Sequence, residues 1–333
     1  MKRREFLCQS GVLLLTLSRM GPVGGGESPG RGNKATGFVY DPIYLEHWLE
    51  PGHPESPQRL KSILAAMENS GLMQQVQSLR PLAGVEPYLL LVHTREHVES
   101  IRAGYGHSHE VALAAVGGVL AAVREVGNGA LRNAFCAVRP PGHHARNTGR
   151  EEGFCLYNTV AVAARYAQRV LQLEKVLIVD WDYHHGNGTE EFFYADPTVL
   201  FFSTHDFHAY PGTGDPARTG AGAGKGYNIN VPLDCGVTDD DIYQAFADQL
   251  LPAARSFKPD LILISAGFDS RRDDLLGCFD VTDEGYVRLT RMIMKLADEF
   301  CDGRIVSVLE GGYNPAGLAS AVVAHVRTLL EKA

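Results

Sequence analysis

The chain has 333 residues, enough for one large domain or two on a prior of roughly 150 residues per domain. Its 45% hydrophobic and 21% charged residues exclude a disordered chain, a collagen-like fibre and a disulfide-stapled miniprotein. The balance of 31 Lys and Arg against 39 Asp and Glu gives a net charge of −8, which argues against direct nucleic-acid binding through a basic face.

Residues 1–26 differ from the rest of the chain and have the pattern of an export signal. A twin arginine, Arg3 and Arg4, precedes an apolar run over residues 11–18. This resembles a bacterial twin-arginine signal and predicts an exported, periplasmic protein; a cytoplasmic protein with an unstructured tail is the alternative. No run reaches the about 20 apolar residues that span a bilayer, so we expect no transmembrane span. The glycine-containing residues 27–36 indicate a linker.

The remaining residues, 37–333, alternate short apolar runs with helical periods and indicate a single domain. Apolar residues follow Pro57 and the capping-type Thr282 at helical spacing. Strands are predicted over Gly37–Tyr40, Ala134–Val138, Val176–Asp180, Val199–Ser203, Leu261–Ser265 and Ile305–Leu309. Most of these runs lack polar alternation, as in strands covered on both faces. The pattern predicts an α/β fold with a central, mostly parallel sheet flanked by helices.

The six cysteines form no Cys-x-x-Cys pair, which argues against a thiolate zinc site and a thioredoxin-like motif. If Cys8 is removed with the leader, five remain, an odd number without the spacing of a disulfide framework. We therefore expect the cysteines to be small buried residues.

Reactive side chains gather at the ends of five of the predicted strands, in four cases beside glycines. The chain has 13 histidines, and two adjacent pairs of them belong to these segments. Ligands of open parallel sheets bind beyond the carboxyl ends of the strands. The sequence therefore predicts one site built from residues 139–145, 180–189, 203–205, 265–270 and 309–314.

A metal site is predicted within this cluster. Asp182 and His184 are two residues apart in an extended segment, so both side chains can face the same side. With Asp269 they supply three nitrogen and oxygen ligands and leave positions open for water and substrate, as catalytic zinc sites do. Because no thiolate is present, Fe²⁺ is an alternative to Zn²⁺. A buried hydrogen-bonded pair is the structural alternative for Asp182 and His184.

Acid–base and hydrogen-bonding groups accompany the predicted ligands. His143 and His144 are candidate bases, and Tyr313 is a phenol donor on a glycine-rich turn. Asp180 and Asn187 flank the ligand pair, where they are placed to orient imidazoles.

Together these motifs resemble the histone deacetylase superfamily, in the form of its class II-like bacterial deacetylases and acetylpolyamine amidohydrolases. The likeness extends from about Gly37 to the C-terminus and implies the arginase–deacetylase fold. It is carried by His-Pro-Glu-Ser-Pro-Gln-Arg at 53–59, Arg-Pro-Pro-Gly-His-His-Ala at 139–145, Asp-Trp-Asp-Tyr-His-His-Gly-Asn-Gly-Thr at 180–189, Ala-Gly-Phe-Asp at 266–269 and Leu-Glu-Gly-Gly-Tyr-Asn at 309–314.

The resemblance implies a metal-dependent amidohydrolase that acts on acylated lysine or a small acylated amine. It makes Asp182, His184 and Asp269 the zinc ligands, and His144 the general base and acid. It implies that His143 is an electrostatic partner, that Tyr313 stabilises the oxyanion, and that the orienting groups are Asp180 and Asn187.

Two structural K⁺ or Na⁺ sites and a substrate tunnel are also implied by the resemblance. The inner cation site corresponds to Asp180, Asp182, His184, Ser203 and the carbonyl group of Thr204. The outer site corresponds to carbonyl groups near Phe193, Asp196, Val199 and Tyr227. The tunnel corresponds to the aromatic walls Phe154 and Tyr210, together with Leu276 and Gly312.

Two departures from the family pattern bear on the substrate. Residues 99–110 are expected to form a loop shorter than the acidic loop with which relatives bind substrate backbone, which predicts weak recognition of a peptide backbone. Leu276 occupies a position where polyamine-specific relatives can place glutamate, so an acetylpolyamine amidohydrolase is the less favoured alternative.

Two further alternatives are a catalytically silent acyl-lysine binding module and an arginase-like ureohydrolase. The first is expected to lose a ligand or the tyrosine, whereas this chain keeps them all. The second needs additional aspartates around a second metal ion. No heptad or amphipathic tail indicates an oligomer interface.

Overall fold

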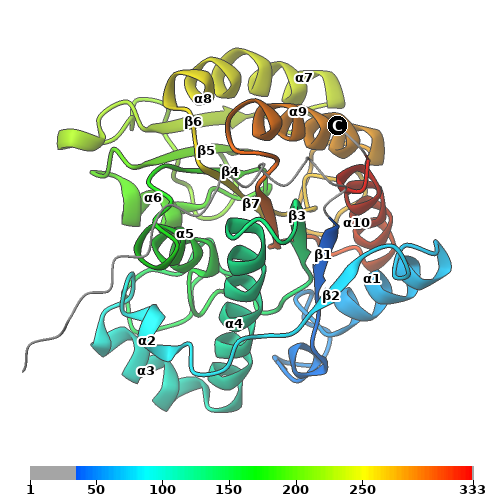
Figure 1. Cartoon of the computed structure of the whole chain (residues 1–333). Helices are drawn as coiled ribbons and strands as arrows, with labels where there is room; N and C mark the ends of the chain where they lie inside the picture. The colour runs from blue at the N-terminus through cyan, green and yellow to red at the C-terminus, as the bar shows by residue number, and fades with distance from the viewer. Residues whose placement is uncertain (1–34, 332–333) are drawn as a thin grey trace, which may run out of the picture. The chain divides into compact units, whose positions relative to one another are not determined.

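The computed structural model describes residues 35–331; the predicted leader, the linker up to residue 34 and Cys8 lie outside this range. A parallel sheet of eight strands, in the order β2-β1-β3-β8-β7-β4-β5-β6, forms its centre (Figure 1). The strands are β1 Thr36–Val39, β2 Gln77–Leu79, β3 Asn133–Cys136, β4 Val176–Asp180, β5 Val199–Asp206, β6 Asn228–Leu233, β7 Leu261–Ala266 and β8 Ile305–Leu309.

The six predicted strands are confirmed, with ends that differ by up to three residues. Every residue of β1, β3, β4, β5, β7 and β8 is buried, which accounts for their apolar runs. The two strands that the sequence did not indicate, β2 and β6, are the edges of the sheet and are partly exposed. β6 contains Pro232, a residue that is compatible with an edge strand but not with a central one.

Helices cover both faces of the sheet (Figure 1). Connections between parallel strands cross over in a right-handed sense. Connections that lead toward one edge of the sheet therefore lie on one face, and those that lead toward the other edge lie on the opposite face. One layer accordingly contains α3, α4, α5 and α6, and the other contains α1, α8, α9 and α10. The helices are α1 Gln58–Asn69, α2 Glu86–Leu89, α3 Arg95–Tyr105, α4 His107–Gly127, α5 Thr159–Val170, α6 Asn187–Phe193, α7 Asp239–Ala245, α8 Leu251–Phe257, α9 Asp283–Phe300 and α10 Pro315–Leu329.

The two predicted helix starts are confirmed. Pro57 immediately precedes α1, and the Thr282 side chain accepts a hydrogen bond from the Gly285 backbone N–H at the start of α9. Both helices turn their apolar residues toward the core. Among residues 35–331, no helix is both long and apolar enough to cross a bilayer.

The prediction of a loop over residues 99–110 is wrong. The segment belongs to α3 and α4, which are separated only by Gly106 at a φ of 48°. A residue without a Cβ adopts this backbone conformation at little cost, so one glycine suffices for the reversal. The side of the molecule at which we expected a loop is therefore built from two packed helices.

The interpretation of the cysteines holds for three of them and is wrong for two. Cys136, Cys155 and Cys301 are free and buried. Cys235 and Cys278, both exposed, instead form a disulfide between the segment after β6 and the loop after β7. Their separation of 43 residues has no recognisable spacing, because the fold rather than the local sequence brings the two segments together.

Candidate metal centre and active site

Five adjacent strands position the candidate site. β3, β8, β7, β4 and β5 are consecutive neighbours in the sheet, and they are the five strands whose ends carry the reactive residues. Because all of them are parallel, their carboxyl ends lie at one edge. The sheet order therefore brings together segments that are up to 175 residues apart, from residue 139 to residue 314.

Asp182, His184 and Asp269 converge as the sequence predicts. One potential ligand atom from each lies within 4.8 Å of the others. The Nδ1 atom of His184 lies 3.2 Å from Asp182 Oδ1 and 3.0 Å from Asp269 Oδ2. Backbone N–H groups hold the carboxylates in place, since Gly311 donates to Asp182 Oδ2 at 2.7 Å and Tyr183 donates to Asp269 Oδ1 at 2.9 Å.

Two glycines give the carboxylates the space that they occupy. A Cβ on Gly311 would overlap the Asp269 and Asp182 carboxylates, and a Cβ on Gly267 would overlap that of Asp182. Both glycines belong to motifs that the sequence contains, Ala-Gly-Phe-Asp and Leu-Glu-Gly-Gly-Tyr-Asn. The close approach of backbone to ligand is therefore encoded next to the ligands themselves.

The electrostatics of the three residues suit a bound cation. Burial and the neighbouring Asp182 carboxylate raise the pKa of Asp269 to about 7. Burial disfavours a charged His184, but hydrogen bonds to Asp182 and Asp269 outweigh it and raise the pKa of His184 to about 10. The carboxylate pair thus requires a positive charge between its members. A divalent ion that displaces the His184 proton would supply it, and two carboxylates with one imidazole fit Zn²⁺ or Fe²⁺.

The two adjacent histidines have different partners. His143 Nδ1 donates to Asp180 Oδ2 at 3.0 Å, whereas His144 Nδ1 donates to Asn187 Oδ1 at 2.8 Å. Both histidines are almost fully buried, and their ring centroids are 4.0 Å apart. The His144 ring lies 6.0 Å from that of His184, so it borders the metal-binding residues.

These partners give the two imidazoles opposite protonation states. Burial disfavours a charged His143, but Asp182 and Asp180 outweigh it and raise its pKa well above 6.5. Burial and the positive charges of His143 and His184 lower the pKa of His144 well below 6.5. A neutral His144 with its Nδ1 proton held by Asn187 presents Nε2 as a free base.

Tyr313 lies on the turn after β8 and is 5% exposed. Its backbone N–H donates to Asp274 Oδ2 at 2.7 Å, and the Arg59 guanidinium lies 5.0 Å from its ring centroid. Burial and the Asp269 carboxylate raise the pKa of Tyr313 well above 10, so its hydroxyl keeps its proton. Gly312, which precedes it, accepts a hydrogen bond from Arg59 Nε at 2.6 Å.

Phe154 and Tyr210 stand beside these groups. The Phe154 ring lies 5.9 Å from that of Tyr313, and the Tyr210 ring lies 5.0 Å from that of His144, both edge to face. A Cβ on Gly153 would overlap the His144 ring, so glycine is required there. Leu276 is 40% exposed on the loop after β7.

The residues of the inner cation site lie at the carboxyl end of β4 and in β5, and those of the outer site lie mainly around the start of β5. Asp180 is the register partner of Ser203, whose Oγ lies 2.9 Å from His205 Nδ1. The buried Thr204 Oγ1 has no hydrogen-bond partner among the described residues. In the outer set, Phe193 O accepts from the Asp196 N–H and Tyr227 O accepts from the Phe201 N–H, while Val199 begins β5.

Glu310 is a site residue that the sequence analysis did not single out. Its buried carboxylate accepts hydrogen bonds from the backbone N–H groups of Gly142, at 2.6 Å, and His143, at 3.2 Å. It thereby ties the turn after β3, which carries both histidines, to the end of β8. The residue was visible in the Leu-Glu-Gly-Gly-Tyr-Asn motif, but a backbone-anchoring role has no local signal.

Comparisons with known proteins agree with the geometry. The model of the histone deacetylase domain matches residues 53–329. Histone deacetylase 5 of Arabidopsis thaliana is 40% identical over 92% of this chain, and a probable deacetylase of Archaeoglobus fulgidus is 39% identical over 85% of it and 82% of the archaeal protein. The crystal structure of the HDA15 HD domain matches with a TM-score of 0.84, at 38% identity over 89% of this chain and 90% of that one. The chain spans only 50% of the length of the plant deacetylase 5.

Proposed function

Because the chain belongs to the histone deacetylase family, we propose that it is a zinc-dependent deacylase acting on acetyl-lysine or a similar acylated primary amine. The observation that carries the proposal is the convergence of Asp182, His184 and Asp269 beside His144, whose Nδ1 is engaged by Asn187. Fe²⁺ is the alternative ion for this donor set. The ion, when bound, polarises the amide carbonyl and lowers the pKa of a water molecule.

His144 is proposed as the general base and acid. Its Nε2 is free to take a proton from the attacking water, because its Nδ1 proton is engaged with Asn187. The same nitrogen then returns the proton to the leaving amine. His143, held in its charged form by Asp180 and Asp182, contributes positive charge beside the reacting centre.

Tyr313 is proposed as the donor that stabilises the oxyanion. Its high pKa keeps the hydroxyl protonated, so it can donate to the carbonyl oxygen as negative charge develops there. Phe154 and Tyr210 would flank the side chain of the substrate that carries the acyl group, and Leu276 and Gly312 would complete the lining of the tunnel. Their aromatic contacts with Tyr313 and His144 support this placement.

Structural K⁺ or Na⁺ is proposed at the two sets of residues described above. The register pairing of Ser203 with Asp180, which places the two residues side by side, supports the inner site. Carbonyl groups that already accept one hydrogen bond keep a second lone pair, so the outer set is also compatible with a cation.

Acylated lysine is favoured over acylpolyamines as the substrate. Leu276 offers no charge to a second ammonium group, and it is partly exposed rather than part of the core. A silent binding module is disfavoured because the complete set of ligands, bases and tyrosine is present. A side-by-side screen of acetyl-lysine peptides, acetylpolyamines and longer acyl-lysines distinguishes the substrate classes.

Metal removal tests the proposed chemistry directly. Treatment with a chelator is expected to abolish hydrolysis of a fluorogenic acetyl-lysine substrate, and added Zn²⁺ or Fe²⁺ is expected to restore it. Asp182→Ala should lose both metal and activity, whereas His144→Ala should lose activity and keep the metal. Full activity after verified metal removal would refute the proposal. Urea release from arginine would instead identify a ureohydrolase.

A further inference from the structure

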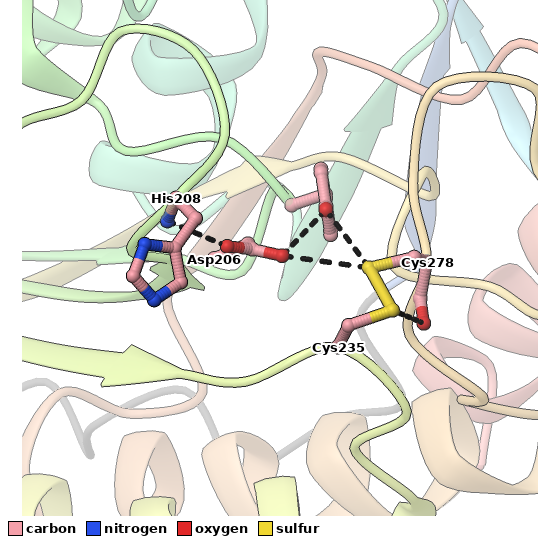
Figure 2. Close-up of a disulfide and its surroundings, with 5 residues drawn as sticks. Asp206, His208, Cys235 and Cys278 are labelled. Carbon is pink, nitrogen blue, oxygen red and sulfur yellow. Dashed lines mark hydrogen bonds between the residues drawn. A yellow bond between two sulfur atoms is a disulfide. The ribbon is translucent and has the colours of Figure 1, made fainter.

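The Cys235–Cys278 disulfide lies close to the candidate site but outside its chemistry. Cys235 follows β6, and Cys278 lies in the loop between β7 and α9, which also contains the proposed ligand Asp269. Both cysteines are exposed, so small reductants and oxidants have access to the bond. Figure 2 shows the bond between these two segments, with Asp206 beside it.

The loop between Asp269 and Cys278 contacts two of the proposed functional residues. Gly277 packs so closely on the Asp269 carbonyl that a Cβ there would overlap it. The Asp274 carboxylate accepts hydrogen bonds from the backbone N–H groups of Tyr313, at 2.7 Å, and Asn314, at 3.1 Å. The position of this loop therefore bears on both Asp269 and Tyr313.

Cys278 is also connected to the candidate site through Tyr183, which contacts both the cysteine and Asp269. The Cys278 Sγ lies 3.4 Å from Asp206 Oδ2 (Figure 2). It also lies 3.2 Å from the Tyr183 hydroxyl, which donates to the same carboxylate oxygen at 2.6 Å. The backbone N–H of Tyr183 donates to Asp269 Oδ1. A Cys278 thiol would find an acceptor already in place in Asp206, so the reduced state is also accommodated.

We propose that the Cys235–Cys278 pair is a redox-sensitive crosslink that holds the loop bearing Asp269, Asp274 and Leu276 in its active position. Reduction by a dithiol breaks the S–S bond and leaves two protein thiols, which take up two electrons and two protons, while the dithiol closes to its own disulfide. A disulfide oxidant reverses the reaction by thiol–disulfide exchange. The effect on turnover rests on the proposed function; the effect on the loop does not.

Reduction is expected to loosen the loop without unfolding the domain. The segments on either side of the bond remain joined by the Gly236 N–H to Cys278 O and Asp280 N–H to Val237 O hydrogen bonds. Thr282 also remains bonded to the Asp239 carboxylate through its N–H and hydroxyl. Reduction therefore removes the covalent tie at Cys278, and we expect residues 270–278 to become more mobile while the hydrogen bonds of Asp274 and of residues 278–282 keep the loop attached.

The experiment compares the purified, metal-loaded full chain before and after reduction with a phosphine. The phosphine becomes its oxide with oxygen from water, and each cysteine gains a proton. Alkylation under native conditions and mass spectrometry should find Cys235 and Cys278 blocked before reduction and labelled after it. Amide exchange over residues 270–278 should accelerate about tenfold, and kcat/KM should fall about 2-fold to 30-fold, the usual scale of coupling through packed contacts.

Cys235→Ser is the matched variant, because it has no bond to break. It should resemble the reduced wild type in exchange and turnover and should not respond to the phosphine. Metal content, measured throughout, should stay constant. Unchanged exchange over 270–278 after verified reduction, or labelling of both cysteines without reductant, would overturn the crosslink. An altered loop in a protein that hydrolyses no acyl-lysine substrate would leave the crosslink standing and refute the proposed function.

Discussion

At the scale of single residues, one amide group separates the roles of two neighbouring histidines. His143 faces the Asp180 carboxylate and His144 faces the Asn187 amide, and only the latter is held neutral. Asn187→Asp places a negative charge on the Nδ1 side of His144, so the pKa of that imidazole should rise. A general base with a higher pKa is protonated over more of the acidic range, so the acidic limb of the kcat/KM profile should move to higher pH. An unmoved limb in a variant with normal metal content would argue against His144 as the base.

The hydroxyl group of Tyr313 is the proposed oxyanion donor, and its removal tests that role. Tyr313→Phe removes only the hydroxyl, so metal content and melting temperature should not change. Turnover should fall by about two to three orders of magnitude, the scale of a lost oxyanion donor. Tyr243→Phe is the control, because Tyr243 lies in α7, packs on Arg288 of α9 and belongs to none of the segments that form the candidate site. A Tyr313→Phe enzyme as active as the control would rule out the assigned role.

At the scale of elements, the sequence identified what lies in the middle of the sheet and missed what lies at its edges. Central strands are buried on both faces, so they appear as apolar runs, and their ends carry the reactive motifs. β2 and β6 are short or polar, and their pairing depends on neighbours distant in sequence. The same holds for the Cys235–Cys278 bond and for the Glu310 anchor, which join segments without a local pattern.

The glycines at the ends of β7 and β8 give a prediction about these elements. Gly311→Ala forces a methyl group against the Asp269 and Asp182 carboxylates, so metal affinity should fall by about 10-fold to 100-fold. Gly104→Ala is the matched control, since a Cβ at this exposed position of α3 meets no atom within 4 Å. It should retain full metal affinity and be slightly more stable, as Ala favours helix over Gly by about 1 kcal/mol. Equal metal affinities in titrations of the two variants would contradict this account.

At the scale of the whole molecule, buried histidines make the fold sensitive to acid. Burial lowers the pKa of His93, His205 and His325 to about 3 from an ordinary value of 6.5. Between about pH 3 and pH 6.5 the unfolded chain binds protons at these histidines that the native state does not. The free energy of unfolding therefore keeps its full value above about pH 6.5 and falls as the pH decreases below it. Each such residue should contribute a slope of about 1.4 kcal/mol per pH unit.

His325 isolates one of these contributions. It is fully buried between Thr290 and Ser307, at 2.7 Å and 2.9 Å from their hydroxyl groups. His325→Gln should be less stable than the wild type at pH 7, but its free energy of unfolding should fall less steeply between about pH 6 and pH 4. Urea denaturation at several pH values measures both slopes, with the exposed His107→Gln as the control. Parallel slopes for the wild type and His325→Gln would contradict the assignment.

The location of the protein in the cell is a property of the whole chain. We propose that the twin-arginine segment directs export of the folded protein. The metal ligands extend from Asp182 to Asp269, so the site exists only after folding, and metal binding is then coupled to folding in the cytoplasm. The Cys235–Cys278 disulfide supports the proposal, since such bonds persist in oxidising compartments and are rare in the cytosol.

The test is fractionation of bacteria that express the full chain, followed by alkylation of free thiols. The wild type should appear in the periplasm with Cys235 and Cys278 protected, while a variant with Arg3→Lys and Arg4→Lys should stay in the cytoplasm with both cysteines labelled. The buried Cys136, Cys155 and Cys301 should react only after denaturation in either fraction, which provides the internal control. A wild type confined to the cytoplasm would refute export. Because no proposed active-site residue lies in the first 26 residues, the deacylase proposal does not depend on that outcome.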